Sequence, residues 1–534
     1  MQTSGDNYQS PYWLLIGIVM VLGTLVRLMP VTGASFPLSD GGLFYAMARD
    51  IQAEGFWLPA ITSYNQQSIP FAYPPLALYL AALLDSVTRW SLMNIVRLLP
   101  VIASVLTLGA FFLLARDVLR SRLVVVFAVL AFALLPESFH ALVMGGGLTR
   151  SVGFLFSLLA LQQTFRLFTR NSRWHLPLAI LLSGATVLSH PEQAWFLAYS
   201  TVILSLAKGR SRQGLINTIW LGLGVLAVTA PWWATVASRH GIGVFLSATS
   251  HGWPITNGLL QLLLWGGTQE TLVPVIFFLA LLGVVSCAMR REFWLPVWAL
   301  AIFLLDSWMP ATMASIPIAL LAGIGMGDVL YPLLTGEISF RRQASEPTPR
   351  PTTWLVVGAV AAIVIYAALS ALVTGNLYLH ALSGEERDAM AWVAANTSKN
   401  SSFLVVTGDR WGDDRSAEWF PVLAERRSVT TVQGSEWLGN GEFARRVRQS
   451  ETLRLCAARN ANCLEQLIGD TGTFVTHIYV PKRAATSSIF QRPGSLPTGN
   501  DCCWSLRASL NQNPRYALLY DGPGAAVFEK IIVQ

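Results

Sequence analysis

The sequence has few charged residues: Asp, Glu, Lys and Arg make up 13% of its 534 residues, whereas a soluble domain has about 25%. Hydrophobic residues account for 53%. This composition excludes an ordinary soluble protein and indicates a chain that crosses a membrane several times. The net charge of +7 does not indicate nucleic-acid binding, because the basic residues lie in short loops between apolar runs, where membrane topology accounts for them.

Carboxylates are especially scarce in the first part of the chain. Residues 1–375 contain 14 of the 30 Asp and Glu residues, and residues 376–534 contain the other 16. The sequence therefore predicts two domains, a transmembrane domain over 1–375 and a water-soluble domain over 376–534. The polar, proline-rich segment 335–353 is expected to be a linker between the last two spans.

Long apolar runs predict a mostly α-helical, polytopic bundle of about eleven spans. They lie near 12–30, 94–115, 123–139, 151–167, 176–190, 194–207, 215–236, 272–288, 293–308, 313–332 and 354–374. Alternate loops of this domain contain 14 Lys and Arg residues, and the opposite loops contain five. Because basic loops face the cytoplasm, we expect a plasma-membrane protein with a cytoplasmic N-terminus. Asp40 and the C-terminal domain then lie outside.

One apolar run, 75–87, is too short to be a span, because 1.5 Å per residue does not cover about 30 Å of hydrocarbon. We expect it to be an interfacial or half-inserted helix. The first outer loop then extends over 31–93, which is long enough to form a structured lid. Residues 256–266 have the same interpretation.

The C-terminal domain alternates predicted strands and helices, which indicates an α/β domain with a mostly parallel sheet. No glycine-rich phosphate loop follows a predicted strand. Four of the five cysteines lie in this domain, at positions 456, 463, 502 and 503. An even number in an oxidising compartment predicts disulfides. We expect the adjacent Cys502 and Cys503 to pair with Cys456 and Cys463 rather than with each other.

Carboxylates near a membrane each need a reason, because ions are costly in lipid. Eight lie on the predicted outer side: Asp40, Asp50, Glu54, Asp85, Glu137, Glu192, Glu270 and Asp306. Asp40 is the strongest catalytic candidate, because the two glycines that follow it let a backbone approach a ligand closely; the alternative is a helix N-cap. Glu137 and Glu192 are candidates for sugar binding. The alternative for Glu137 is a polar residue at the membrane interface, and the alternative for Glu192 is a capping turn. For Asp306 we expect a structural hydrogen bond.

The second outer loop reads MGGGLTRSVG, in which three glycines precede Thr149 and Arg150 at the start of a span. Backbone N–H groups there and the Arg150 guanidinium predict an anion-binding surface. The alternative is snorkelling by Arg150 and helix packing by the glycines. Further candidates for donor binding are Tyr73, His140, His190, Arg239, His240 and His251. Arg27, inside the first span, needs a partner that the sequence does not identify.

Three stretches resemble the GT-C superfamily of integral-membrane glycosyltransferases, which use sugars carried on polyprenyl phosphates. The first outer loop, SDGGLFYAMARDIQAEG followed by FAYPPLALYLAALL, is similar to that of protein mannosyltransferases and aminoarabinose transferases. The segment LLPESFHALVMGGGLTRSVG is similar to oligosaccharyltransferase catalytic subunits, and EWFPVLAERRSVTTVQGSEW lies where those subunits have a tryptophan-rich acceptor-binding motif. The resemblance implies that Asp40 is the acid at the active site. It also makes Trp419 and Trp437 candidates for stacking on a sugar.

The chain departs from those families at three places. Gly41 replaces the second acid of the mannosyltransferase loop, and glycines replace the two metal-binding acids of the oligosaccharyltransferase loop. Trp419 is followed by Phe420 instead of an acid. No cofactor is firmly predicted, and Mg or Mn is the alternative.

From these residues we predict a membrane glycosyltransferase that moves a sugar from a polyprenyl-phosphate donor to an acceptor hydroxyl, with inversion. Asp40 is its general base. The predicted partners are the lipid-linked donor, membrane lipids and an acceptor that is a protein, a lipid or a polysaccharide. The alternatives are a non-catalytic scaffold of a glycan-assembly complex, and a flippase or transporter of lipid-linked sugars.

Overall fold

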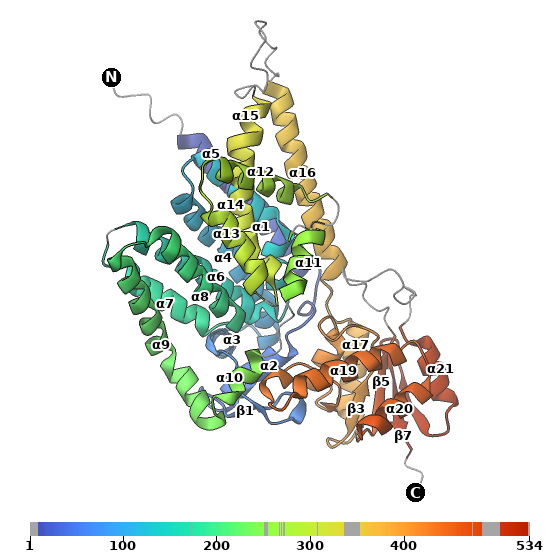
Figure 1. Cartoon of the computed structure of the whole chain (residues 1–534). Helices are drawn as coiled ribbons and strands as arrows, with labels where there is room; N and C mark the ends of the chain where they lie inside the picture. Colours follow the sequence, from blue (N-terminus) through green and yellow to red (C-terminus); the bar gives the residue numbers. More distant parts are fainter. Residues whose placement is uncertain are drawn as a thin grey trace, which may run out of the picture.

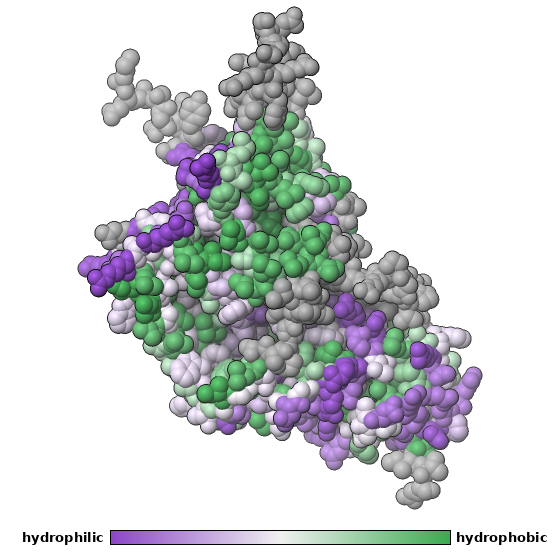
Figure 2. Space-filling view, viewed as in Figure 1, coloured by the Kyte–Doolittle hydropathy of each residue, from purple (hydrophilic) through white to green (hydrophobic). Residues whose placement is uncertain are grey.

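The computed structural model describes residues 9–170, 172–249, 255–265, 267–268, 270, 273–306, 308–335, 353–472, 474–482 and 502–531. A helix bundle forms one part of the molecule, and a smaller domain of strands and helices lies at one end of it (Figure 1). Hydrophobic residues cover the bundle, and hydrophilic residues concentrate on the C-terminal domain (Figure 2). The linker predicted over 335–353 lies almost wholly outside the described residues.

Each predicted span coincides with a helix. These helices are α1 (Gln9–Thr32), α4 (Leu92–Val118), α5 (Arg122–Leu134), α6 (Gly147–Thr169), α7 (His175–Val187), α8 (Pro191–Lys208), α9 (Arg212–His240), α12 (Val275–Met289), α13 (Trp294–Leu305), α14 (Pro310–Ile324) and α16 (Thr353–Tyr378). In the described part of the chain, six helices are long and apolar enough to cross a membrane. A seventh span is possible where α5 meets the following turns at an 81° bend. The chain is a multi-pass membrane protein, and the number of eleven spans stays a prediction.

The bundle accommodates Arg27 of α1 by hydrogen bonding. This side chain is fully buried and donates to the Ala133 carbonyl at 2.9 Å and to the Ser138 hydroxyl at 2.9 Å. Its guanidinium also lies over the ring of Phe139, 5.2 Å from the centroid. A buried cation is tolerated where hydrogen bonds compensate for its lost hydration, so Arg27 joins α1 to the end of α5.

The first outer loop is structured, as predicted. It contains α2 (Gly42–Ala53), β1 (Ile61–Thr62), η1 (Tyr64–Gln66), β2 (Ile69–Pro70) and α3 (Leu76–Val87). The Asp50 carboxylate holds the hairpin, because its Oδ2 accepts from the Thr62 hydroxyl at 2.6 Å and from the Ser63 N–H at 2.9 Å. The predicted helix 75–87 is therefore present as α3, and its depth in a membrane stays a prediction. Two further helices, α10 (Gly243–Thr249) and α11 (Ile255–Trp265), follow α9.

The C-terminal domain has a five-stranded sheet with the order β4-β3-β5-β7-β6. Its elements are α17 (Gly384–Asn396), β3 (Ser402–Val405), α18 (Arg415–Leu423), β4 (Arg427–Ser428), η5 (Ser435–Trp437), α19 (Glu442–Cys456), α20 (Ala461–Thr471), β5 (His477–Pro481), α21 (Trp504–Gln512), β6 (Tyr516–Asp521) and β7 (Ala525–Lys530). The prediction of a mostly parallel sheet is wrong. β3 pairs in parallel with β4 and β5, but β7 pairs antiparallel with β5 and with β6. A short turn joins β6 to β7 as a hairpin, and this makes those two strands antiparallel.

Alternate residues of the central strands point to opposite faces of this sheet. Phe403, Val405 and Tyr479 belong to a buried cluster that also includes side chains of the first outer loop. Leu404, Val406 and Ile478 belong to a separate cluster with α19, α20 and α21. One face of the sheet therefore contributes to a core that it shares with the lid.

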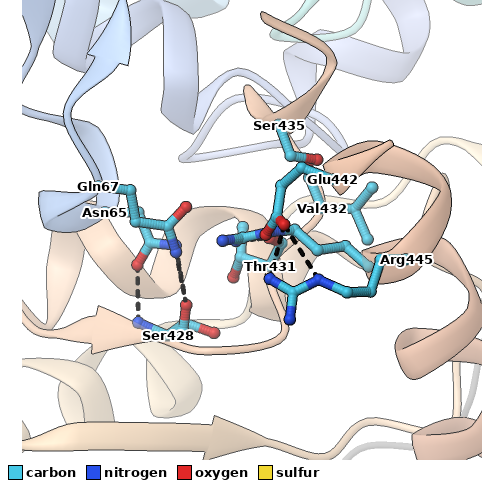
Figure 3. A network of polar contacts seen from close by, with 9 residues as sticks. Asn65, Gln67, Ser428, Thr431, Val432, Ser435, Glu442 and Arg445 are labelled. Carbon is cyan, nitrogen blue, oxygen red and sulfur yellow. Dashed lines mark hydrogen bonds and ion pairs between the residues drawn. The ribbon is translucent and has the colours of Figure 1, made fainter. Parts of the chain in front are cut away.

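Polar contacts also join the lid to the C-terminal domain (Figure 3). The Asn65 side chain donates to the Ser428 carbonyl at 2.8 Å and accepts from the Ser428 N–H at 2.7 Å. Gln67 donates to the same carbonyl at 3.4 Å. The Asn65 side chain thus makes two hydrogen bonds with the backbone of the edge strand β4. These bonds fix the first outer loop to the C-terminal domain.

The four cysteines of the C-terminal domain form disulfides, as predicted, but the predicted pairing is wrong. Cys456 pairs with Cys463, and Cys502 pairs with Cys503. The end of α19 and the start of α20 fold back on each other and bring the Cα atoms of Cys456 and Cys463 to 5.4 Å, which is within the range for a disulfide.

Candidate active site

Asp40 lies in a tight segment between α1 and α2, where the first outer loop, the second outer loop and the C-terminal domain meet. Its Oδ2 is 2.5 Å from Nη2 of Arg150, and its Oδ1 accepts from the Gly146 N–H at 2.6 Å. The residues on both sides of it have positive φ, 54° at Ser39 and 122° at Gly41. Strained backbone that is held by its surroundings is typical of functional sites.

The three glycines of the second outer loop make room for Asp40. A Cβ on Gly145 would lie 1.9 Å from the Asp40 carbonyl oxygen, and a Cβ on Gly146 would lie 2.2 Å from Asp40 Oδ2. A Cβ on Gly147 would lie 2.1 Å from the Leu142 carbonyl. Real side chains do not tolerate such separations, so the glycines allow the backbone to enclose this carboxylate. The helix α6 begins at Gly147 and carries Arg150 on its first turn.

Arg150 is held in place on two sides. Its Nη1 donates to the Ala141 carbonyl at 2.9 Å, and its Nη2 donates to Asp40. The side chains of Arg150 and Asp40 are 17% and 18% exposed, so their ion pair is mostly shielded from water. A guanidinium has five N–H donors, and donors beyond these two are left for an anionic ligand.

The C-terminal domain contributes Glu418, which the sequence did not single out. Its Oε1 accepts from the Gly41 N–H at 2.8 Å, and its backbone carbonyl accepts from the Tyr64 hydroxyl at 2.7 Å. Burial raises the pKa of Glu418 to about 8, and the nearby negative charge of Asp40 acts in the same direction. Glu418 therefore holds a proton at neutral pH.

Trp419, proposed from the resemblance as a sugar-binding residue, is fully buried. Its Nε1 donates to the Ser39 carbonyl at 3.2 Å, and its ring lies against Phe36, with centroids 4.6 Å apart. A ring that is enclosed in this way has no free face for a sugar. Trp419 and Glu418 instead hold the residues on either side of Asp40. The sequence feature that could have identified Glu418 as a site residue is its position directly before Trp419.

Other residues that were predicted for the site lie near the Asp40–Arg150 ion pair. The Tyr73 hydroxyl is 3.2 Å from the Thr149 hydroxyl, and the His190 ring is 6.0 Å from the Tyr73 ring. Glu192 interacts electrostatically with both Arg150 and Asp306. Asp306 Oδ1 accepts from the Trp308 and Met309 N–H groups, which confirms its predicted structural hydrogen bond.

Several buried polar atoms near Arg150 have no hydrogen-bond partner in the described part of the chain. They are Nδ1 of His190, Oε2 of Glu192, both side-chain polar atoms of Gln193, the Tyr199 hydroxyl and Oδ2 of Asp306. Buried polar groups are normally hydrogen-bonded. These unpaired donors and acceptors are therefore candidates for contact with a polar ligand.

The side chains of Glu137, Arg239 and His240 contact other parts of the described chain. Glu137 is buried in the bundle and accepts from the Thr312 hydroxyl at 3.2 Å, and His140 lies in the turn that follows it. Arg239 donates to the Leu58 carbonyl at 2.7 Å, and Nε2 of His240 is 2.8 Å from the Ala60 carbonyl. The last two side chains join α9 to the lid. His251 lies outside the described residues.

The carboxylate oxygens of Asp40 already take part in contacts within the protein. One of these contacts is with a guanidinium, which would repel a cation. Within the described residues, no three His, Cys, Asp or Glu side chains form a group that could hold a metal ion.

The fold is similar to those of solved membrane-protein structures that share little sequence with this chain. The oligosaccharyltransferase AglB of Archaeoglobus fulgidus, in complex with an inhibitory peptide and a dolichol-phosphate, matches with a TM-score of 0.54 and 14% identity, over 89% of this chain and 70% of that one. ArnT of Cupriavidus metallidurans in the apo state matches with a TM-score of 0.53 and 14% identity, over 98% of both chains. ArnT bound to undecaprenyl phosphate has a TM-score of 0.50 and 14% identity, over 99% of both. No protein-family model and no curated protein sequence matches the chain.

Proposed function

We propose that this protein is a glycosyltransferase that moves a sugar from a polyprenyl-phosphate donor to an acceptor hydroxyl at the outer face of the plasma membrane. The observation that carries the proposal is the shielded Asp40–Arg150 ion pair, in which a carboxylate suited to act as a base lies next to a guanidinium suited to bind phosphate. Solved structures of similar fold are bound to undecaprenyl phosphate or dolichol-phosphate, and this supports a lipid phosphate as the donor.

In the proposed reaction, Asp40 accepts the proton of the acceptor hydroxyl as its oxygen attacks the anomeric carbon. The bond from that carbon to the phosphate oxygen breaks on the opposite side, so the configuration inverts and the lipid phosphate leaves with the electron pair. Arg150 stabilises the charge on the phosphate through its free N–H groups, an effect that is strong in a site shielded from water.

The orphaned polar atoms of His190, Glu192 and Asp306 are suited to the hydroxyl groups of the donor sugar. Each sugar hydroxyl is both a donor and an acceptor, so it can satisfy a carboxylate oxygen and a ring nitrogen alike. These residues fix the sugar next to Arg150, and correct placement of the reacting carbon accounts for a large part of the rate.

We infer that the transfer needs no divalent metal, because glycines take the place that an acidic pair would occupy, and two of them, Gly145 and Gly146, lie directly against Asp40. Arg150 supplies the positive charge instead. Unlike a metal ion, an arginine is not removed by a chelator, and the transfer assay below uses this difference.

The test uses purified protein in detergent, a radiolabelled polyprenyl-phosphate hexose and a panel of protein, lipid and polysaccharide acceptors. We expect label transfer that persists in EDTA. A matched control is Glu54→Gln, because Glu54 is an exposed carboxylate of the same loop and its loss should change nothing. Loss of transfer in EDTA, with recovery on adding Mg or Mn, contradicts the metal-independent step. Absence of transfer with every donor and acceptor favours a scaffold.

A further inference from the structure

A second polar site lies at the opposite end of the bundle from Asp40. A cavity of about 280 Å³ is lined by Tyr12 and Trp13 of α1 and by residues at the junction of α4 and α5, namely Arg116, Leu119, Arg120, Ser121, Arg122 and Val125. Because α1 has 24 residues and a helix rises 1.5 Å per residue, its two ends are about 36 Å apart. The cavity and Asp40 therefore face opposite sides of a membrane. Hydrophilic residues gather at this end of the bundle (Figure 2).

Three arginines surround the cavity, and two of them are held over aromatic rings. The Arg122 guanidinium lies 5.6 Å from the centroid of the Tyr12 ring, and the Arg116 guanidinium lies 5.8 Å from that of Phe112. Such cation–π contacts orient a guanidinium and leave its N–H groups at the edge free to donate. Topology explains why arginines lie on this side of the membrane, but it does not explain why they converge on one cavity.

The carboxylate that is closest in sequence does not neutralise this cluster. Asp117 points toward α6, where its Oδ2 is 2.6 Å from Arg166 and its Oδ1 is 2.7 Å from Arg170. Arg120 pairs with Glu292 at 2.7 Å in an exposed contact. Among the described residues that line the cavity there is no carboxylate. Among the described residues, Arg116 and Arg122 therefore have no carboxylate partner, and they share the cavity with the hydroxyl groups of Tyr12 and Ser121.

We propose that this cavity binds the phosphate headgroup of an anionic phospholipid in the membrane leaflet opposite Asp40. A volume of about 280 Å³ corresponds to roughly nine water molecules, at about 30 Å³ each, which is enough for a phosphodiester with part of its glycerol. Basic pockets at the membrane surface are suited to lipid headgroups. This site is separate from the donor site, and it does not depend on the proposed transferase activity.

The surroundings favour a lipid over free phosphate. Trp13, on the rim of the cavity, is 54% exposed, and the next residue, Leu14, is 64% exposed. These side chains continue along the surface of α1 below the arginines, and in a membrane they face acyl chains. A tryptophan at such a position is typical of the headgroup level of a bilayer. Binding of the headgroup thus leaves the lipid tails beside α1.

The test measures binding of a phosphatidylglycerol to the full-length protein, purified in a zwitterionic detergent, by native mass spectrometry and by thermal stabilisation. The variant is Arg116→Gln with Arg122→Gln. The control is Arg210→Gln with Arg212→Gln, because these exposed arginines lie just before α9 and at its first residue and do not line the cavity. About 1 kcal/mol for each arginine corresponds to a loss of about fivefold in affinity for each, and about 30-fold for the pair.

The proposal is supported if the cavity variant binds phosphatidylglycerol at least tenfold more weakly than the control variant, with phosphatidylcholine binding weakly to both. It is overturned if the cavity and control variants retain the lipid equally. It is also overturned if inorganic phosphate at equal concentration displaces the lipid, since the cavity would then be a site for the free anion. Monodispersity on gel filtration, together with the single variants, shows whether a loss reflects misfolding.

Discussion

Replacing Glu418 with glutamine removes a buried carboxyl group while keeping the oxygen that accepts from the Gly41 N–H. In the folded protein, burial first, and then the charge of Asp40, raise the pKa of Glu418 from 4.5 to about 8. Between these two values the folded chain holds a proton that the unfolded chain has released. The free energy of unfolding contributed by this group therefore falls as the pH rises through that window, and glutamine lacks the effect.

The size of the effect follows from proton linkage. One proton of difference between the folded and unfolded states changes the free energy of unfolding by about 1.4 kcal/mol per pH unit. Between pH 6 and pH 8 the wild type should therefore lose up to about 3 kcal/mol of stability relative to Glu418→Gln. Burial also raises the pKa of Glu436 to about 7, but this group is present in both proteins and its contribution cancels in the difference.

The assay is thermal unfolding of the two purified proteins at pH 6, 7, 8 and 9, followed by tryptophan fluorescence, with Glu54→Gln as a control. The unfolding temperature of the wild type should fall relative to that of Glu418→Gln up to about pH 8 and then stay at a constant offset. Transfer activity should also decline above pH 8 in the wild type, because the negative charge of an ionised Glu418 repels the negative charge of Asp40. Parallel stability curves for the two proteins would refute the assignment of a proton to Glu418.

Three further substitutions test the geometry around Asp40. Gly146→Ala adds a Cβ that would lie 2.2 Å from Asp40 Oδ2, and the displaced carboxylate should lower kcat on the order of 100-fold; Gly33→Ala, which meets nothing within 4 Å, should leave kcat unchanged. Arg150→Gln removes the cation and should lower kcat about 10²–10³-fold, and an unchanged kcat would exclude Arg150 from phosphate stabilisation. Trp419→Phe loses one hydrogen bond, with a cost of about 1 kcal/mol in stability; kcat should fall while KM for the donor stays the same, whereas a raised KM for the acceptor would restore the sugar-stacking role.

Much of the fold could be predicted because its signals are local. The position of each helix of the bundle follows from the length of an apolar run, and α17, α18 and β3 follow from the periodicity of their own side chains. The direction of β7 was missed because strand pairing depends on which strands meet in space. The disulfide of Cys502 with Cys503 was missed because spacing alone does not determine connectivity.

The candidate site was predictable only in part. Asp40 and Arg150 stood out as ions in apolar surroundings, but their pairing joins positions that are 110 residues apart. Glu418 reaches Gly41 across 377 residues, and no local pattern shows such a contact. The second outer loop was predicted to present backbone N–H groups to an anion, and the group that the Gly146 N–H contacts in the structure is the Asp40 carboxylate.

Transfer kinetics of Asp40→Asn test the central claim most directly. Asparagine keeps the shape of the side chain and an oxygen for the Gly146 N–H, but it cannot accept the proton of a hydroxyl. The measurement compares wild type, Asp40→Asn and Glu54→Gln at equal amounts of folded protein, with a radiolabelled polyprenyl-phosphate hexose as donor. The account predicts that kcat falls at least 100-fold for Asp40→Asn, and that Glu54→Gln matches the wild type. A variant Asp40→Asn that transfers sugar at the wild-type rate would contradict it.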